Sequence, residues 1–91
     1  MLRIITKQRG NTYRLELHGA VADEWIRVLE GHWLAIVDKV PSAIVTVGLS
    51  NVQFIDRDGE RLLRRMAECG VEFDGAGCLN RYVIEKISGG R

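Results

Sequence analysis

The feature that most constrains the fold is a succession of strand, turn and helix signals in the middle of the chain. A nearly continuous apolar run, Ala43-Ile-Val-Thr-Val47, has the length of a strand that is covered on both faces. A short loop and a second apolar pair, Phe54-Ile55, follow it. Next comes an acidic turn that opens an amphipathic helix predicted over residues 57–69, with Gly70 as its stop. Such strand-to-helix successions build α/β folds.

The N-terminal residues predict a β-hairpin. Residues 2–8 form a short apolar strand that we place at a sheet edge, and Gly10-Asn11 suits the tight turn after it. In the second strand, apolar and polar residues alternate, which puts one face on the core and the other in water. Gly19 is predicted to end this strand, and its core-facing residues are Tyr13, Leu15 and Leu17.

A long helix is predicted to follow, from about Ala22 to Val40. Asp23 is the candidate for its start, because an aspartate side chain can cap the free N–H groups there. Pro41 blocks its continuation. At about 100° per residue the apolar side chains fall on one stripe, which consists of Ala22, Ile26, Leu29, Trp33, Ile36, Val37 and Val40.

The C-terminal part predicts a short fourth strand at residues 71–73 and a last helix over residues 79–87. A chain of 91 residues suits a single domain, which we take to span residues 1–91. The order β-β-α-β-α-β-α predicts the α/β class. We expect a small mixed sheet of about four strands, with three helices packed mainly on one face.

The passage from residue 45 to residue 63 resembles the signature of STAS domains, the fold of bacterial anti-sigma factor antagonists. Their pattern is an apolar strand, then Leu-Ser-Gly-Val-x-Phe-Ile/Met-Asp-Ser-Ser-Gly, then an apolar-periodic helix. Here Leu49-Ser50-Asn51-Val52-Gln53-Phe54-Ile55-Asp56 matches that pattern, and so does Gly59. Arg57 and Asp58 replace the two serines, the second of which is the family's phosphoacceptor. The resemblance covers residues 13–87 and implies a STAS-like fold.

The resemblance also implies a function: non-catalytic protein–protein interaction in bacterial signal transduction and transcription regulation. The implied partner is an anti-sigma factor that is also a kinase. In the family, the turn and the helix after it form the recognition face. The candidate partner-binding residues are therefore Asp56, Arg57, Asp58, Gly59, Arg61 and Arg65. An alternative is an adaptor subunit of a transporter, as in some lipid ABC systems, or of a multi-protein signalling scaffold.

Asp58 stands at the position that is phosphorylated in the family, and it has no hydroxyl group, so serine phosphorylation is excluded there. Its carboxylate carries one negative charge, whereas a phosphoserine carries about −1.5 to −2. Asp58 could therefore mimic the modified state weakly, or it could only cap the helix, which stabilises by about 0.5–2 kcal/mol. Ser50 is the nearest other hydroxyl, and a local turn bond is the simpler role for it.

Two other features have a structural explanation and a functional one. Arg57, Arg61, Arg64 and Arg65 form a basic ridge, which is either a solvated face partly neutralised by Glu60 and Glu68 or a docking surface for an acidic partner. On the long helix, Trp25, Val28 and His32 lie on one flank. They are either the margin of the core or an apolar patch that binds a partner or forms a homodimer.

Composition excludes several other classes. A net charge of +1 gives no general attraction to nucleic acid or to an anionic membrane, and no apolar run approaches the ~20 residues that span a bilayer. Cys69 and Cys78 match no redox or metal spacing, and His18 and His32 lack partners at ligand spacing. We find no catalytic or nucleotide-binding motif. The expectation is a cytoplasmic protein that is not an enzyme and holds no cofactor or metal.

Overall fold

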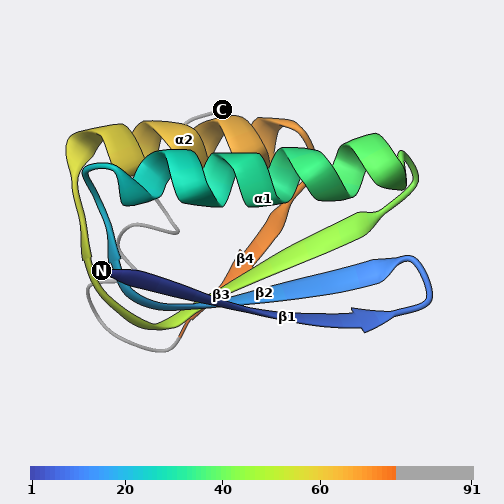
Figure 1. Cartoon of the computed structure of the whole chain (residues 1–91), viewed down its shortest axis with the longest axis horizontal. Coiled ribbons are helices and arrows are strands. Elements are labelled where there is room, and N and C mark those ends of the chain that lie inside the picture. The colour runs from blue at the N-terminus through green and yellow to red at the C-terminus, as the bar shows by residue number, and fades with distance from the viewer. Residues whose placement is uncertain (76–91) are drawn as a thin grey trace.

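The computed structural model describes residues 1–75, which form a four-stranded sheet and two helices (Figure 1). The order in the sheet is β1-β2-β3-β4, with β1 and β2 antiparallel and the other two pairs parallel. The predicted α/β class with a mixed sheet is confirmed. The helix predicted at residues 79–87 lies outside the described residues. The elements are β1 (Leu2–Arg9), β2 (Thr12–Val21), α1 (Trp25–Lys39), β3 (Ile44–Ile55), α2 (Arg57–Glu68) and β4 (Glu72–Asp74).

Helices α1 and α2 lie side by side on one face of the sheet (Figure 1). The core fills the space between the two layers. Buried residues of β1, β2, β3 and both helices form it, and β4 contributes Phe73, which is partly buried against it. The periodicity of the sequence explains this layer, because the alternating apolar residues of β2 and the apolar stripe of each helix face each other. The largest fully buried side chains are Leu15, Leu17, Val21, Leu29, Val47, Leu49, Leu62, Leu63 and Met66.

The hairpin prediction is confirmed, except for the end of its second strand. Gly10 has a φ of +63° in the turn, and β1 is an edge strand of the sheet. Gly19 does not end β2, which continues to Val21. Gly19 has a φ of +108° and sits where the register against β3 shifts. The glycine therefore marks an irregularity inside the strand, which is the other common role of a glycine there.

Helix α1 begins later than predicted, at Trp25, and Asp23 does not cap it. Asp23 has a φ of +56° and lies in the left-handed region, which aspartate tolerates better than most residues. It turns the chain from β2 into the helix. Glu24 occupies the N-cap position without a side-chain hydrogen bond.

Strand β3 is one continuous strand of 12 residues, so the predicted loop between two apolar segments is wrong. Relative to β2 it carries an extra residue at two places, where the register shifts between Glu16 and His18 and between Gly19 and Ala20. Each shift breaks the alternation of faces. For this reason polar residues in the middle of β3 resemble a loop, although Leu49 and Val52 around them are buried.

Helix α2 spans Arg57–Glu68, close to the predicted 57–69, and Gly70 ends it as predicted. Gly70 has a φ of +98°, and its N–H donates to the carbonyl of Ala67 at 3.0 Å. The N–H of Val71 donates to the carbonyl of Met66, also at 3.0 Å, which completes a Schellman motif. The chain then enters β4, one residue later than predicted.

Candidate functional site

The turn between β3 and α2 is built around Asp56. Its Oδ1 accepts a hydrogen bond from the N–H of Gly59 at 2.7 Å, so Asp56 is the N-cap of α2. Its Oδ2 accepts from the N–H of Asp23 at 3.3 Å, and its own N–H donates to the carbonyl of Val21 at 3.2 Å. One aspartate thus ties the start of α2 to the junction between β2 and α1. The prediction that Asp58 could be the cap is wrong.

Gly59 is buried against the end of β2, in the first turn of α2. A Cβ atom built at this position would overlap the carbonyl oxygen of Val21 and would lie 3.0 Å from its Cγ1. Only a glycine lets the helix approach the strand this closely. Two of the candidate partner-binding residues therefore have structural roles: the carboxylate of Asp56 and the buried backbone of Gly59 hold the turn in place.

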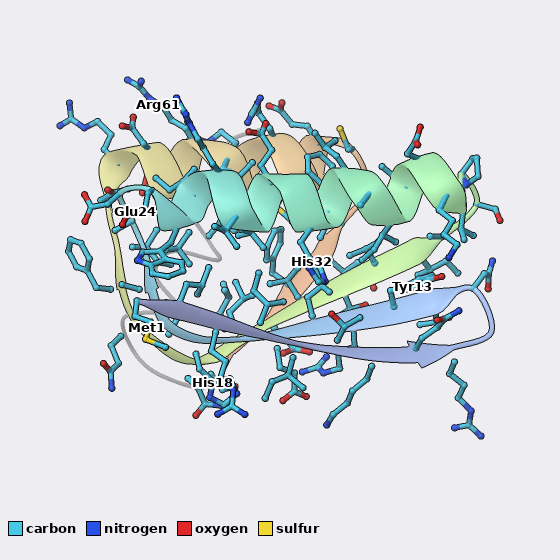
Figure 2. The ribbon with its side chains drawn as sticks, in the orientation of Figure 1. Met1, Tyr13, His18, Glu24, His32 and Arg61 are labelled. Carbon is cyan, nitrogen blue, oxygen red and sulfur yellow. The ribbon has the colours of Figure 1, made fainter. Side chains whose placement is uncertain are left out.

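The other residues of the turn point outward. Arg57 is exposed and makes no ion pair within residues 1–75, and the Asp58 side chain is 72% exposed. Asp58 lies 3.6 Å from Arg61, which projects from α2 away from the sheet (Figure 2). Phe54, at the end of β3, is 54% exposed. These four residues form a turn surface of mixed charge with one large aromatic side chain.

Phe54 was not among the sequence candidates. Strict alternation would place it on the same side as buried Val52. The extra residue in β3, Gln53, changes the register, since Val52 pairs with Gly19 while Phe54 pairs with the next residue, Ala20. The sequence gives no direct signal of this shift. An exposed aromatic beside a charged turn is a common feature of protein-binding surfaces.

The arginine ridge on α2 is less free than its sequence suggests. Arg65 reaches across to α1, where its Nη2 lies 2.6 Å from Oε2 of Glu30. Arg64 lies 3.6 Å from Glu60 within α2. From the sequence we expected Glu60 and Glu68 to neutralise the ridge, and Glu60 does pair with it. The ridge also pairs with Glu30 and Asp58, which were not expected. A shallow groove of about 540 Å³ follows the ridge and is lined by Ile26, Asp58, Arg61, Leu62, Arg64, Arg65 and Glu68.

Of the two explanations for residues 25, 28 and 32 of α1, the margin of the core agrees with the structure and a shared apolar patch does not. Trp25 packs against the core, and Val28 is 47% exposed. His32 lies between α1 and the sheet (Figure 2), where its Nε2 is 2.7 Å from Oγ1 of Thr6 on β1. His32 is therefore half-buried and contacts the sheet, and the exposed apolar surface of α1 lies elsewhere on the helix. Ser50 lies in β3, exposed, rather than in a loop.

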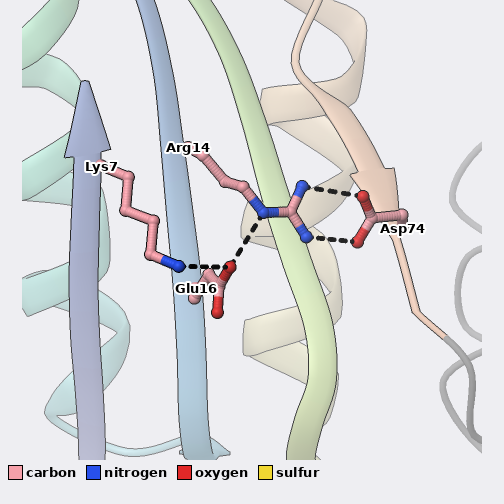
Figure 3. A network of polar contacts seen from close by, with 4 residues as sticks. All are labelled: Lys7, Arg14, Glu16 and Asp74. Atoms are coloured by element: carbon pink, nitrogen blue, oxygen red, sulfur yellow. Dashed lines mark hydrogen bonds and ion pairs between the residues drawn. The ribbon is translucent and has the colours of Figure 1, made fainter. Parts of the chain in front are cut away.

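A second polar cluster lies on the sheet and was not predicted (Figure 3). Arg14 of β2 forms two parallel hydrogen bonds with Asp74 of β4, at 2.8 and 3.0 Å, and a third with Glu16 at 3.0 Å. Lys7 of β1 lies 3.5 Å from the same oxygen of Glu16. Gly48 of β3 leaves room for the arginine, since a Cβ there would lie 2.8 Å from its Nη2. We call the Arg14–Asp74 pair the arginine clasp.

Arg14 lowers the pKa of both carboxylates that it contacts. The hydrogen bonds from Arg14 hold the pKa of Asp74 below its ordinary value of 3.8 and lower the pKa of Glu16 as well. A carboxylate with a lowered pKa stabilises the folded state above its ordinary pKa, and this stabilisation is lost as the pH falls through the folded-state pKa. Here the loss falls below about pH 4.

We expect Arg14→Met to reduce the free energy of unfolding by about 0.5–1 kcal/mol above pH 5, the upper range for an exposed ion pair. As the pH falls below about 4, the difference between the variant and the wild type should shrink, because the carboxylates of Asp74 and Glu16 become protonated. Urea unfolding as a function of pH measures both. Lys7→Met, which removes only the longer contact, is the matched control and should follow the wild type. Parallel curves for Arg14→Met and wild type would contradict the assignment.

Within residues 1–75 no three His, Cys, Asp or Glu side chains gather as a metal site would require. Neither described helix has the length and apolar character that crossing a bilayer demands. Cys69 is exposed and is not in a disulfide. The second cysteine, Cys78, lies outside the described part of the chain.

Comparison with known proteins supports the fold class. No protein-family model matches the chain, and no curated protein does. A solved structure described as "Crystal Structure Analysis of Mglu" superposes with a TM-score of 0.60 over 80% of this chain, at 21% sequence identity. The superposed region is 19% of that protein, so this chain spans about a fifth of its length. At this identity the likeness is one of fold: a small mixed α/β domain.

Proposed function

We propose that this protein is a non-catalytic protein–protein interaction module of the STAS type, related in function to anti-sigma factor antagonists. Its partner docks on the turn surface, which consists of Phe54, Arg57, Asp58 and Arg61. The absence of a serine at position 58 makes this a recognition surface without the family's phosphorylation switch at that residue. Asp58 supplies a constant negative charge in its place.

The observation that supports this proposal is the division of roles within the turn. Asp56 and Gly59 hold the backbone against β2, while Arg57 and Asp58 between them project into solvent. A surface whose backbone is fixed before binding loses little conformational entropy when a partner docks. Phe54 adds an aromatic anchor, and Arg57 adds an exposed guanidinium that forms no ion pair within residues 1–75. Both residue types are enriched at protein interfaces.

Quantitative affinity capture from the native lysate tests the proposal. We expect Arg57→Glu/Arg61→Glu to reduce capture of the wild-type partner at least about tenfold, since reversing charges at an interface opposes the complementary surface. The matched control is Arg3→Glu/Arg9→Glu, which makes the same charge change on exposed residues of β1. The control should capture as much partner as the wild type. Equal capture by both double variants would contradict the proposed surface.

The captured protein distinguishes the two non-catalytic functions. A sigma-factor regulator or kinase supports the antagonist, whereas a permease or ATPase subunit supports the transporter adaptor. Asp58→Ser restores a hydroxyl group at position 58, where a kinase partner would be expected to add phosphate. With a kinase as partner, intact mass after incubation with ATP should show one phosphate on Asp58→Ser and none on the wild type. Stoichiometric phosphate on the wild type would contradict the loss of the switch.

A further inference from the structure

The outward face of α1 is apolar at its centre and charged at both ends. Val28 and Leu34 are 47% and 46% exposed, and Gly31 and Ala35 between them are also exposed. At 100° per residue these positions fall within about 120° of the helix surface, so they share one face. A shallow depression lies over it, lined by Gly31, Leu34, Ala35, Val37 and Asp38.

Nothing in residues 1–75 explains why position 31 is a glycine. Its φ is not positive, and a Cβ atom there would meet no atom of residues 1–75 within 4 Å. Glycine is among the poorest helix formers, so an exposed helix interior normally selects against it. Small residues on a helix face allow a second helix axis to approach closely. Gly31 and Ala35, one turn apart, would provide such an approach.

The charged residues at the two ends of α1 indicate which kind of partner could bind this face. Glu24 and Arg27 stand at the N-terminal end of the face, and Asp38 and Lys39 stand at the C-terminal end. All four are exposed, and none makes an ion pair with another residue of the described chain. Each end therefore carries one acid and one base that form no ion pair within residues 1–75.

We propose that this face binds a second copy of the chain, with the two α1 helices antiparallel about a two-fold axis near Gly31. In that arrangement Glu24 lies beside Lys39 of the second copy, and Arg27 lies beside Asp38 of the second copy. On a helical projection Glu24 and Lys39 fall on one side of the face, while Arg27 and Asp38 fall on the other. A two-fold axis between antiparallel helices places each side of the face against the same side of the second copy. Both ion pairs can therefore form in a single arrangement.

The same geometry disfavours a parallel pair. Parallel helices would place Glu24 against Glu24 and Lys39 against Lys39, and like charges repel. Antiparallel helices also align their dipoles favourably. A helix of 15 residues is roughly 22 Å long, so the contact is smaller than the about 800 Å² per partner of a standard interface. The dimer should therefore be weak, with a Kd of about 10–100 µM.

Sedimentation equilibrium of the full chain, up to about 500 µM, tests this dimer. We expect wild-type association in the stated range and at least about tenfold weaker association for Ala35→Arg, which fills the close approach with a charged side chain. Arg9→Glu, at an exposed residue of β1 outside both proposed surfaces, is the control and should associate like the wild type. A monomeric wild type at all concentrations would overturn the proposal, and so would a dimer that Ala35→Arg leaves intact.

A charge exchange tests the antiparallel register. Lys39→Glu places two acids together at both symmetric contacts, and we expect it to weaken association about 3- to 10-fold. Adding Glu24→Lys restores opposite charges at both contacts, so the double variant should regain wild-type association. If the double variant associates no better than Lys39→Glu, the proposed register is wrong. Circular dichroism of each variant confirms that the domain remains folded.

Discussion

Gly59→Ala should lower the free energy of unfolding by about 2–3 kcal/mol, the usual cost of forcing an extra methyl into a tightly packed site. The methyl group would overlap the carbonyl of Val21, a backbone atom that cannot move aside like the end of a side chain. In a domain of this size the midpoint of thermal unfolding should fall by about 10–20 °C. Differential scanning calorimetry and urea unfolding measure the two quantities.

Gly31→Ala is the matched control, because it is the same substitution in the other helix. No described atom lies within 4 Å of its Cβ, so the methyl group costs nothing sterically. It should raise the free energy of unfolding by about 0.5–1 kcal/mol through helix propensity. At about 1 µM protein the proposed dimer makes no contribution. Similar stabilities for Gly59→Ala and Gly31→Ala would show that α2 does not approach β2 as closely as described.

Asp56→Ala should cost about 2 kcal/mol, the second-largest effect that we expect. The substitution removes the N-cap of α2 and the hydrogen bond to the N–H of Asp23 together. Asp58→Ala, two residues later, should cost less than about 1 kcal/mol, since it removes only an exposed ion pair and a favourable charge near the helix start. Urea unfolding of both variants at neutral pH gives the comparison.

Asp56→Asn refines this test, because asparagine caps helices about as well as aspartate but carries only one acceptor oxygen. It can keep the bond from Gly59 and lose the one from Asp23. Its stability should therefore lie between those of the wild type and Asp56→Ala. The opposite order, with Asp58→Ala the less stable of the two alanine variants, would return the capping role to Asp58.

The parts of the fold that follow from local periodicity could be predicted from the sequence. The alternation in β2 and the apolar stripes of both helices identify the core, and Gly10 and Gly70 mark turns that require a positive φ. The failures occur where pairing between strands overrides local pattern. The two extra residues in β3 hide a continuous strand, and they cannot be located without knowing the register against β2.

The candidate site could be predicted in position but not in orientation. The family-like pattern locates the turn at residues 56–59, yet it does not say which of two aspartates caps the helix. That choice depends on Val21 and Asp23, which approach Asp56 only in the folded chain. The same holds for two ion pairs whose partners are distant in the sequence and meet only in the folded chain. They are Arg65 with Glu30 of α1, and Arg14 with Asp74, 60 positions later.

The arginine clasp has a consequence for aggregation. Strand β4 contains only three residues and shields a small part of β3, from Thr46 to Gly48. A side of β3 left without a neighbour would offer its peptide groups to any other extended chain, as unprotected sheet margins do in amyloid-forming proteins. By holding so short a strand beside Gly48, Arg14 protects this part of β3, and acid that protonates Asp74 would weaken the protection.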